Sequence, residues 1–263
     1  MTITSAHDTV TFAFPDVHAD AELYIEFIRT LRMRGDVTTN MSAPGIGSLN
    51  VLAAADCVRP APESWNTDDV VLPLWQSEAA TISFAAGYPF LVRVDVDGTN
   101  AITGSRRTAT PDFTTIDHLE MHVQSRLSGH RGGDGLVRQF VPSRLRAPGT
   151  PVDGTDVCTV AIEVTPLRGE VWDRRVVAAE EMYLRSGAVA ESSITEPSDN
   201  WDLAARATGV VRIINSALWL QLNHCDPPHR RLTQATYRRD GLPWFEWYDD
   251  ELAVSDEVAP SAG

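Results

Sequence analysis

Residues 88–98, YPFLVRVDVDG, constrain the fold most, because apolar and charged side chains alternate there with a period of two. The valines of the stretch Val92–Val96 share one face of an extended chain, and Arg93 and Asp95 share the other. The Asp-Gly pair that follows is typical of a turn between neighbouring antiparallel strands. The pattern predicts a strand with one buried face and one face toward water, as in an antiparallel sheet.

The N-terminal part predicts a long hairpin. Apolar residues alternate over Thr9–Phe14, and from Leu23 to Met33 a period of two continues that only Arg29 interrupts. A helix beginning at Glu22 is the competing interpretation, because the same apolar residues also fit helical spacing. Their β-branched and aromatic content favours strands.

Other segments extend this β-rich pattern. Val70–Phe84 predicts one or two strands, and Leu136–Leu145 and Val157–Val164 each predict another. Arg174–Arg185 is the best helix candidate, with alanine and glutamate inside it and arginine at its end. Gly209–Leu222 is compatible with either a strand or a helix. We therefore expect an α+β, β-rich fold of mainly antiparallel sheets with one or two helices.

The 263-residue chain shows no internal repeat or break in composition, so we expect a single β-rich domain over residues 1–252 and a disordered tail over residues 253–263. The formal net charge is −14, and all 22 basic residues are arginine. This acidic balance repels phosphate backbones and argues against nucleic-acid binding. The start of the chain does not resemble a signal peptide, and no apolar run is long enough to span a membrane. We expect a cytoplasmic protein whose three cysteines are reduced thiols.

Four stretches, in order, resemble an uncharacterised family of bacterial proteins. They contain a Leu-Pro-x-x-Gln-x-Glu block in residues 63–84, a Tyr-Pro-Phe strand ending in Asn-Ala-Ile-Thr-Gly in 88–104, the segment 136–145, and a closing Gly-Leu-Pro-Trp-Phe block in 213–251. The resemblance covers about half of the chain. It implies a compact domain with ordered blocks, and it brings no activity to transfer.

Gln76 and Glu78 are the main candidates for a polar site. On a strand they would point the same way, and a buried glutamate needs a partner that Arg138 and Gln139 could supply. Such a glutamate could be a general acid, but a structural ion pair at the edge of the core is the favoured interpretation.

His118, Glu120 and His122 would share one face of a strand and could offer three ligands to a divalent metal. A solvated strand face explains the same pattern, so no metal and no cofactor is favoured. The stretch HCDPPH, residues 224–229, has the side-chain chemistry for zinc but lacks a second pair of ligands, and its two prolines predict an exposed loop.

The closing segment, residues 238–251, reads RRDGLPWFEWYDDE. We expect the chain to be extended after Pro243, so that Trp244, Phe245 and Trp247 pack at least one aromatic face on the domain and fasten the C-terminus. The alternative is an exposed aromatic platform for a partner. In the favoured interpretation, the acids at positions 249–251 follow the fastened segment and serve as solubilising charge.

These features favour a non-enzymatic protein-interaction or structural component of a bacterial cytoplasm, with a protein partner and an undetermined oligomeric state. Seven tryptophans support that hypothesis, because tryptophan is enriched at interfaces. The alternative is an enzyme or small-ligand binding domain, with metal as one such ligand, whose site includes Gln76, Glu78, Arg138, His118 and His122. That alternative requires these side chains to converge in one pocket.

Overall fold

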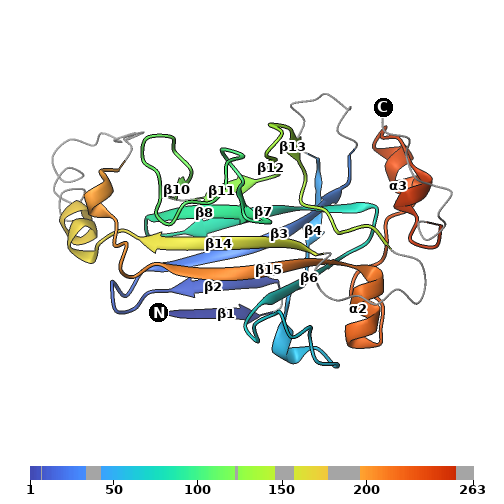
Figure 1. The fold of residues 1–263 in the computed structure, drawn as a ribbon, viewed down its shortest axis with the longest axis horizontal. Helices are drawn as coiled ribbons and strands as arrows, with labels where there is room; N and C mark the ends of the chain where they lie inside the picture. Colours follow the sequence, from blue (N-terminus) through green and yellow to red (C-terminus); the bar gives the residue numbers. More distant parts are fainter. Residues whose placement is uncertain (7, 34–42, 122–123, 146–156, 177–195, 253–263) are drawn as a thin grey trace.

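Two β-sheets form the body of the molecule in a computed structural model (Figure 1). The structure describes residues 1–6, 8–33, 43–121, 124–145, 157–176 and 196–252. The inner faces of the two sheets share one large apolar core, to which Phe12 and Phe27 of one sheet and Val94 and Ile162 of the other contribute. The layered arrangement is a sandwich, the usual result when two amphipathic sheets bury their apolar faces.

The first sheet contains six strands in the order β1-β2-β3-β7-β11, with β4 paired to the end of β3. All of its pairings are antiparallel. Its strands are β1 Thr2–Ala6, β2 Thr9–Ala13, β3 Glu22–Leu31, β4 Gly45–Ser48, β7 Glu78–Ala86 and β11 Gln124–Leu127.

The second sheet contains seven strands in the order β10-β8-β14-β15-β6-β5, with β9 paired to β8. Only the pairing of β15 with β6 is parallel. Its strands are β5 Leu52–Ala53, β6 Val70–Leu74, β8 Phe90–Val96, β9 Thr99–Asn100, β10 Leu119–Met121, β14 Cys158–Pro166 and β15 Ala207–Asn215. A separate two-stranded hairpin joins β12 His130–Arg131 to β13 Val137–Arg138.

The predicted β-rich α+β class with mainly antiparallel sheets is confirmed. The N-terminal hairpin is also confirmed, since β2 and β3 pair directly and the helix starting at Glu22 does not form. Val70–Phe84 forms two strands, and Val157–Val164 falls within β14. Leu136–Leu145 is strand only at Val137–Arg138, so that prediction was largely wrong.

The outer face of β8 differs from the prediction. Arg93 and Asp95 were expected to face water, but their exposed fractions are 0% and 1%. The chain that follows β8 covers them, since Arg93 donates a hydrogen bond to the carbonyl of Thr108 at 2.7 Å. Alternation identified the strand correctly, yet it does not distinguish a solvated polar face from one that a loop covers.

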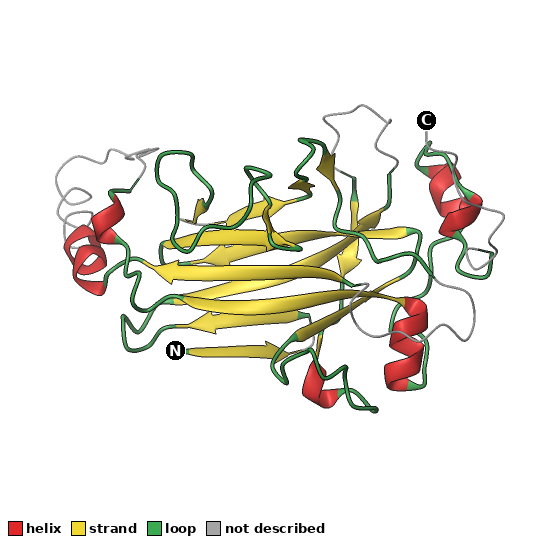
Figure 2. Ribbon diagram, in the orientation of Figure 1, coloured by secondary structure: helices red, strands yellow, loops and turns green. Residues whose placement is uncertain are grey.

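Helices lie at the two ends of the sandwich (Figure 2). Gly209–Leu222 begins as strand β15 and continues as helix α2, Ser216–Asn223; helix α3 spans Gln234–Arg239. Residues 169–176 are helical, which overlaps the start of the predicted helix Arg174–Arg185, while 177–185 lie outside the described residues, as does the predicted tail 253–263. Within the described part of the chain, no helix is long and apolar enough to cross a membrane.

Candidate functional site

The turn between β6 and β7 is where the sequence candidates Gln76 and Glu78 lie. Residues 75–77 form the turn and Glu78 begins β7, so the expectation that Gln76 and Glu78 lie on one strand with both side chains on the same face was wrong. Both residues are nevertheless buried, with exposed fractions of 1% for Gln76 and 0% for Glu78. A turn at the end of the core therefore carries a carboxylate that has no access to water.

Glu78 is paired with Arg29 and His229. One oxygen accepts a hydrogen bond from Nε of Arg29 at 2.8 Å, and the other lies 2.7 Å from Nε2 of His229. The second oxygen also accepts from the backbone N–H of Trp75 at 3.1 Å. A carboxylate removed from water needs such partners, because isolated burial of its charge costs several kcal/mol.

Arg29 is the residue that interrupts the apolar period of β3. Leu23, Ile25 and Phe27 face the core at 0% exposed, and Arg29 has the same parity in the strand. The guanidinium therefore points inward and meets Glu78 across the β3–β7 pairing, whose register matches Leu31 with Glu78. A charged residue at a core-facing position was the signal in the sequence for this partner.

The Glu78–His229 pair resembles a carboxylate–imidazole pair of an enzyme, but its geometry is structural. The Nε2 atom of His229 is directed at Glu78, and its Nδ1 atom is buried with no hydrogen-bond partner. A general base needs one nitrogen within reach of the proton that it abstracts. Since Nδ1 is buried and Nε2 is engaged with Glu78, the pair holds the chain at His229 against the β6–β7 turn.

Arg138 does not reach Glu78. It forms an exposed pair with Asp134 in the β12–β13 hairpin, and the guanidinium lowers the pKa of the Asp134 carboxyl below its usual range. Gln139 instead accepts from the N–H of Met33 at 2.6 Å and donates to the carbonyl of Leu31 at 3.0 Å. The prediction that Arg138 and Gln139 partner Glu78 was wrong, because Arg29 on the neighbouring strand lies closer.

Asp250 anchors the closing segment to the same turn. One carboxylate oxygen accepts from the backbone N–H of Gln76 at 2.8 Å, and the other accepts from the hydroxyl of Ser216 at the start of α2. Burial raises the pKa of Asp250 to about 6, and the charge of Glu78 adds to this effect. Asp250 is thus an internal contact, which corrects the expectation that residues 249–251 serve only as solubilising charge.

Tyr237 and Arg32 fix the other side of the closing segment. The Tyr237 hydroxyl donates to the carbonyl of Ser77 and accepts from the N–H of Arg32 at 2.9 Å. The Arg32 guanidinium donates to the carbonyl of Gln76 at 3.0 Å and lies 4.6 Å from the ring centre of Trp247. Burial lowers the pKa of Arg32 to about 10.

The aromatic rings of the closing segment pack on a small core of their own. Leu31, Leu232, Tyr237 and Tyr248 are buried there, and Trp244, Phe245 and Trp247 pack against them while half-buried. Residues 246–248 form a 3-10 turn, so the expected alternation of an extended chain does not occur. The three rings pack against this core while part of their surface stays exposed, which supports the fastening role. We call residues 229–250, with the β6–β7 turn that they contact, the C-terminal clasp.

His118 and Glu120 lie at the far end of β8 from this clasp. His118 is 4% exposed, with Nδ1 3.2 Å from Asp117 and Nε2 3.8 Å from Glu120; His122 lies outside the described residues. A solvated strand face at His118 is excluded by its burial. Among the described residues, no group of three potential ligands is arranged to bind a metal ion.

The two histidines of residues 224–229 lie in different surroundings. His224 ends α2 and is exposed, whereas His229 turns inward to Glu78, a role that the sequence did not indicate.

A second cluster of buried charges, missed in the sequence, lies on the outer face of β8. Arg93 is 3.5 Å from Asp117 and 3.3 Å from Glu163, and Arg107 is 3.4 Å from Asp95 and 2.7 Å from Glu163. Burial raises the pKa of Asp95, although both arginines oppose this. The available signal was the strict charge alternation of β8, which pairs with β14 so that Arg93 faces Glu163.

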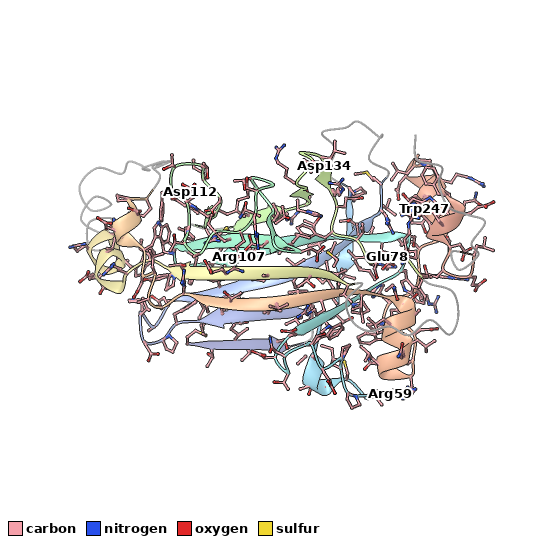
Figure 3. All side chains as sticks on the ribbon, in the orientation of Figure 1. Arg59, Glu78, Arg107, Asp112, Asp134 and Trp247 are labelled. Carbon is pink, nitrogen blue, oxygen red and sulfur yellow. The ribbon has the colours of Figure 1, made fainter. Side chains whose placement is uncertain are left out.

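The candidate residues thus occupy separate places. Figure 3 shows Glu78 and Trp247 at one end of the sandwich, Asp134 (the partner of Arg138) above the sheets, and Asp112 (which contacts Asp117, next to His118) at the other end. They do not converge in one pocket. Comparison with known proteins adds no site, since no family model, curated protein or solved structure matches the chain. The resemblance to an uncharacterised bacterial family stays a prediction.

Proposed function

We propose that the chain is a non-enzymatic protein-interaction component that binds a protein partner along the open strand edge of its sandwich. The observation that carries this proposal is the outer edge of β1. The strand Thr2–Ala6 pairs with β2 on one side, and none of the strands in the described ranges pairs with its other side.

The side chains of β1 offer no protection against pairing with another chain. Its sequence, TITSA, has neither charge nor proline, and Thr2, Thr4 and Ala6 are exposed. Free edges of native sheets are usually blocked by lysine, other charges, proline or a bulge, because an unpaired row of N–H and C=O groups binds further strands. An uncharged, regular edge supports a role in strand pairing with a partner.

The polar residues of the interior support the same proposal. Glu78 binds both Arg29 and His229, and Asp250 binds the β6–β7 turn, so these groups stabilise the clasp. The alternative, an enzyme built from Gln76, Glu78 and the other candidates, requires these side chains to share a pocket. The described members of this set lie in separate places, which favours the interaction function.

A charged edge tests the proposal. In the double variant Thr2→Lys and Thr4→Lys, two ammonium groups at exposed positions of β1 should prevent strand pairing. The matched control is Thr110→Lys, which adds the same charge at an exposed loop position. Each tagged protein is expressed in its source cells, cross-linked chemically to the proteins bound to it, and purified by its tag. Mass spectrometry then identifies the bound proteins and the cross-linked residues.

We expect a stoichiometric partner, cross-linked near β1, with the unmodified protein and with the loop control, and its loss with the edge variant. Equal capture by edge and control variants, or cross-links confined to another face, would contradict the proposal. Circular dichroism of the three proteins confirms that the lysines leave the fold intact.

A further inference from the structure

On the same side of the sandwich, the second sheet has a gap beside β15. The strand β15 pairs with β14 from Ala207 to Ile213, whereas β6 joins it only from Val211 onward. Among the described strands, none lies along the outer side of residues 207–210. In Figure 1, β6 follows only the end of β15 nearest α2. Backbone groups alternate in direction along a strand, so about half of those in residues 207–210 face this gap.

Behind the gap is a cavity of about 60 Å³ between the two sheets. Apolar side chains from both sheets line it; they include Ile3, Val10, Phe12, Phe27, Ile162 and Val211. At Gly209 the strand β15 contributes no side chain to the lining, and the Phe12 ring lies against its backbone, where a Cβ atom would be 2.9 Å from that ring. We call the gap and its cavity the β15 notch.

The size of the cavity restricts what can enter. A water molecule occupies about 30 Å³, and a cavity of about 150 Å³ binds benzene. A space of about 60 Å³ therefore suits one branched aliphatic side chain and excludes an indole ring.

The rim of the notch is acidic. Asp68 lines it, is exposed, and forms no ion pair with any residue in the described part of the chain. Its neighbour Asp69 is neutralised by Arg212, whose NH2 lies 2.8 Å away. With a net charge of −14 on the whole chain, the rim favours a cationic partner.

We infer that the β15 notch accepts an extended segment of a basic protein partner. The segment pairs its backbone with residues 207–210, places one valine-sized side chain in the cavity, and sets a lysine or arginine beside Asp68. Strand addition of this kind obtains affinity from backbone hydrogen bonds and specificity from a pocket for alternate side chains. The inference rests on the proposed function, because it specifies the chemistry of a protein partner on the same side of the sandwich.

Short blocked peptides test the notch directly. The probe is acetyl-Thr-Lys-Val-Lys-Thr-amide, added to the ¹⁵N-labelled full chain and followed by amide chemical shifts. Two comparison peptides replace both lysines by glutamate, or the valine by tryptophan. We expect saturable shifts at Ala207–Val210 and Val10, with affinity at least about tenfold weaker for either comparison peptide, which corresponds to about 1.4 kcal/mol.

The variant Asp68→Arg gives the matched control, because an exposed rim residue changes charge without touching the core. It should abolish or reverse the preference for lysine over glutamate. The inference is overturned if shifts at residues 207–210 are absent, if the lysine and glutamate peptides bind equally, or if Asp68→Arg leaves the preference unchanged. It is also overturned if sedimentation shows a dimer whose interface shifts map to the notch, since a second copy of this chain would then be the occupant.

Failure of the two proposals can be separated. If the β1 edge variant loses its captured partner while no peptide binds the notch, only the notch inference fails. If peptides bind the notch but the edge variant captures its partner normally, the partner uses β15 and the role of the β1 edge is wrong. If neither experiment shows binding, the interaction function itself fails.

Discussion

The C-terminal clasp and the β15 notch both lie where strands of the sandwich end. They differ in whether a distant part of the chain covers the polar groups at that place. At the clasp, a distant part of the chain supplies hydrogen-bond partners to the polar groups of the β6–β7 turn. Asp250 and Tyr237 bind the backbone of residues 76–77, and His229 binds Glu78. At the notch, β6 is only five residues long, and the first part of β15 pairs with β14 on one side but with none of the described strands on its outer side. The comparison shows that polar contacts from distant residues close the clasp end of the sandwich, whereas no described strand covers residues 207–210, where we propose that another chain binds.

The largest expected effect is at the center of the clasp. Glu78→Gln removes the negative charge and leaves the Arg29 guanidinium, 13% exposed, without its counter-ion. Breaking a buried pair in this way costs about 3–5 kcal/mol. Urea unfolding measures the loss, and the control Asp134→Asn, which breaks the exposed pair with Arg138, should cost less than about 1 kcal/mol. Equal losses in the two variants would show that Glu78 is not a buried anchor.

The second effect concerns pH. The pKa of Asp250 is about 6 in the folded protein against 3.8 for the ordinary group, so the folded state binds the proton more tightly. The stabilisation from this proton is complete below pH about 4 and is lost as the pH rises to about 6, with a limit of roughly 3 kcal/mol. Asp250→Asn removes the titration. The difference in unfolding free energy between the two proteins should change across this interval, and a difference independent of pH would refute the assignment.

A third, smaller effect tests the hydroxyl of Tyr237. Tyr237→Phe keeps the ring packing but leaves the carbonyl of Ser77 and the N–H of Arg32 without this partner. We expect a loss of about 0.5–1.5 kcal/mol, because the hydroxyl's hydrogen bonds are lost while the Arg32 N–H still donates to the Ser77 carbonyl at 3.2 Å. Thermal unfolding by calorimetry measures it. A variant as stable as the parent protein would mean that water replaces the hydroxyl and that the clasp is less closed than described.

The smallest effect, of opposite sign, is expected at the notch. Val10→Ile adds one methyl group beside the cavity and should stabilise the protein by about 0.5–1 kcal/mol. The matched control Ala80→Val adds volume where the core is filled around a residue 1% exposed, and it should cost about 1–3 kcal/mol. Denaturant midpoints compare the two. If Val10→Ile destabilises the protein as Ala80→Val does, the cavity is not available to a side chain.

Strands were predictable where local pattern and burial agree. The period of two in Thr9–Phe14 and in Phe90–Val96 identified β2 and β8, because alternation depends only on neighbouring residues. The same pattern misassigned the outer face of β8 as solvated, since the loop that covers Arg93 and Asp95 is a tertiary contact.

The candidate site was predictable in part. Glu78 was identified as a carboxylate in need of a partner, and its burial agrees with that. Its partners were not found, because Arg29 and His229 lie 49 and 151 residues away in the chain. Arg29 left a trace as the one charged residue at a core-facing position of β3, but His229, within an apparently exposed loop, left none.

The sequence by itself determined the β-rich class, the core-facing residues of β2, β3 and β8, and the acidic net charge, because side-chain alternation and net charge are local or additive properties. Only the tertiary structure decided which charges meet, where β6 stops along β15, and that Asp250 and Tyr237 bind the closing segment to the β6–β7 turn. These outcomes depend on the register and order of strands from distant parts of the chain, and each buried charge selects whichever partner that register brings within hydrogen-bond distance.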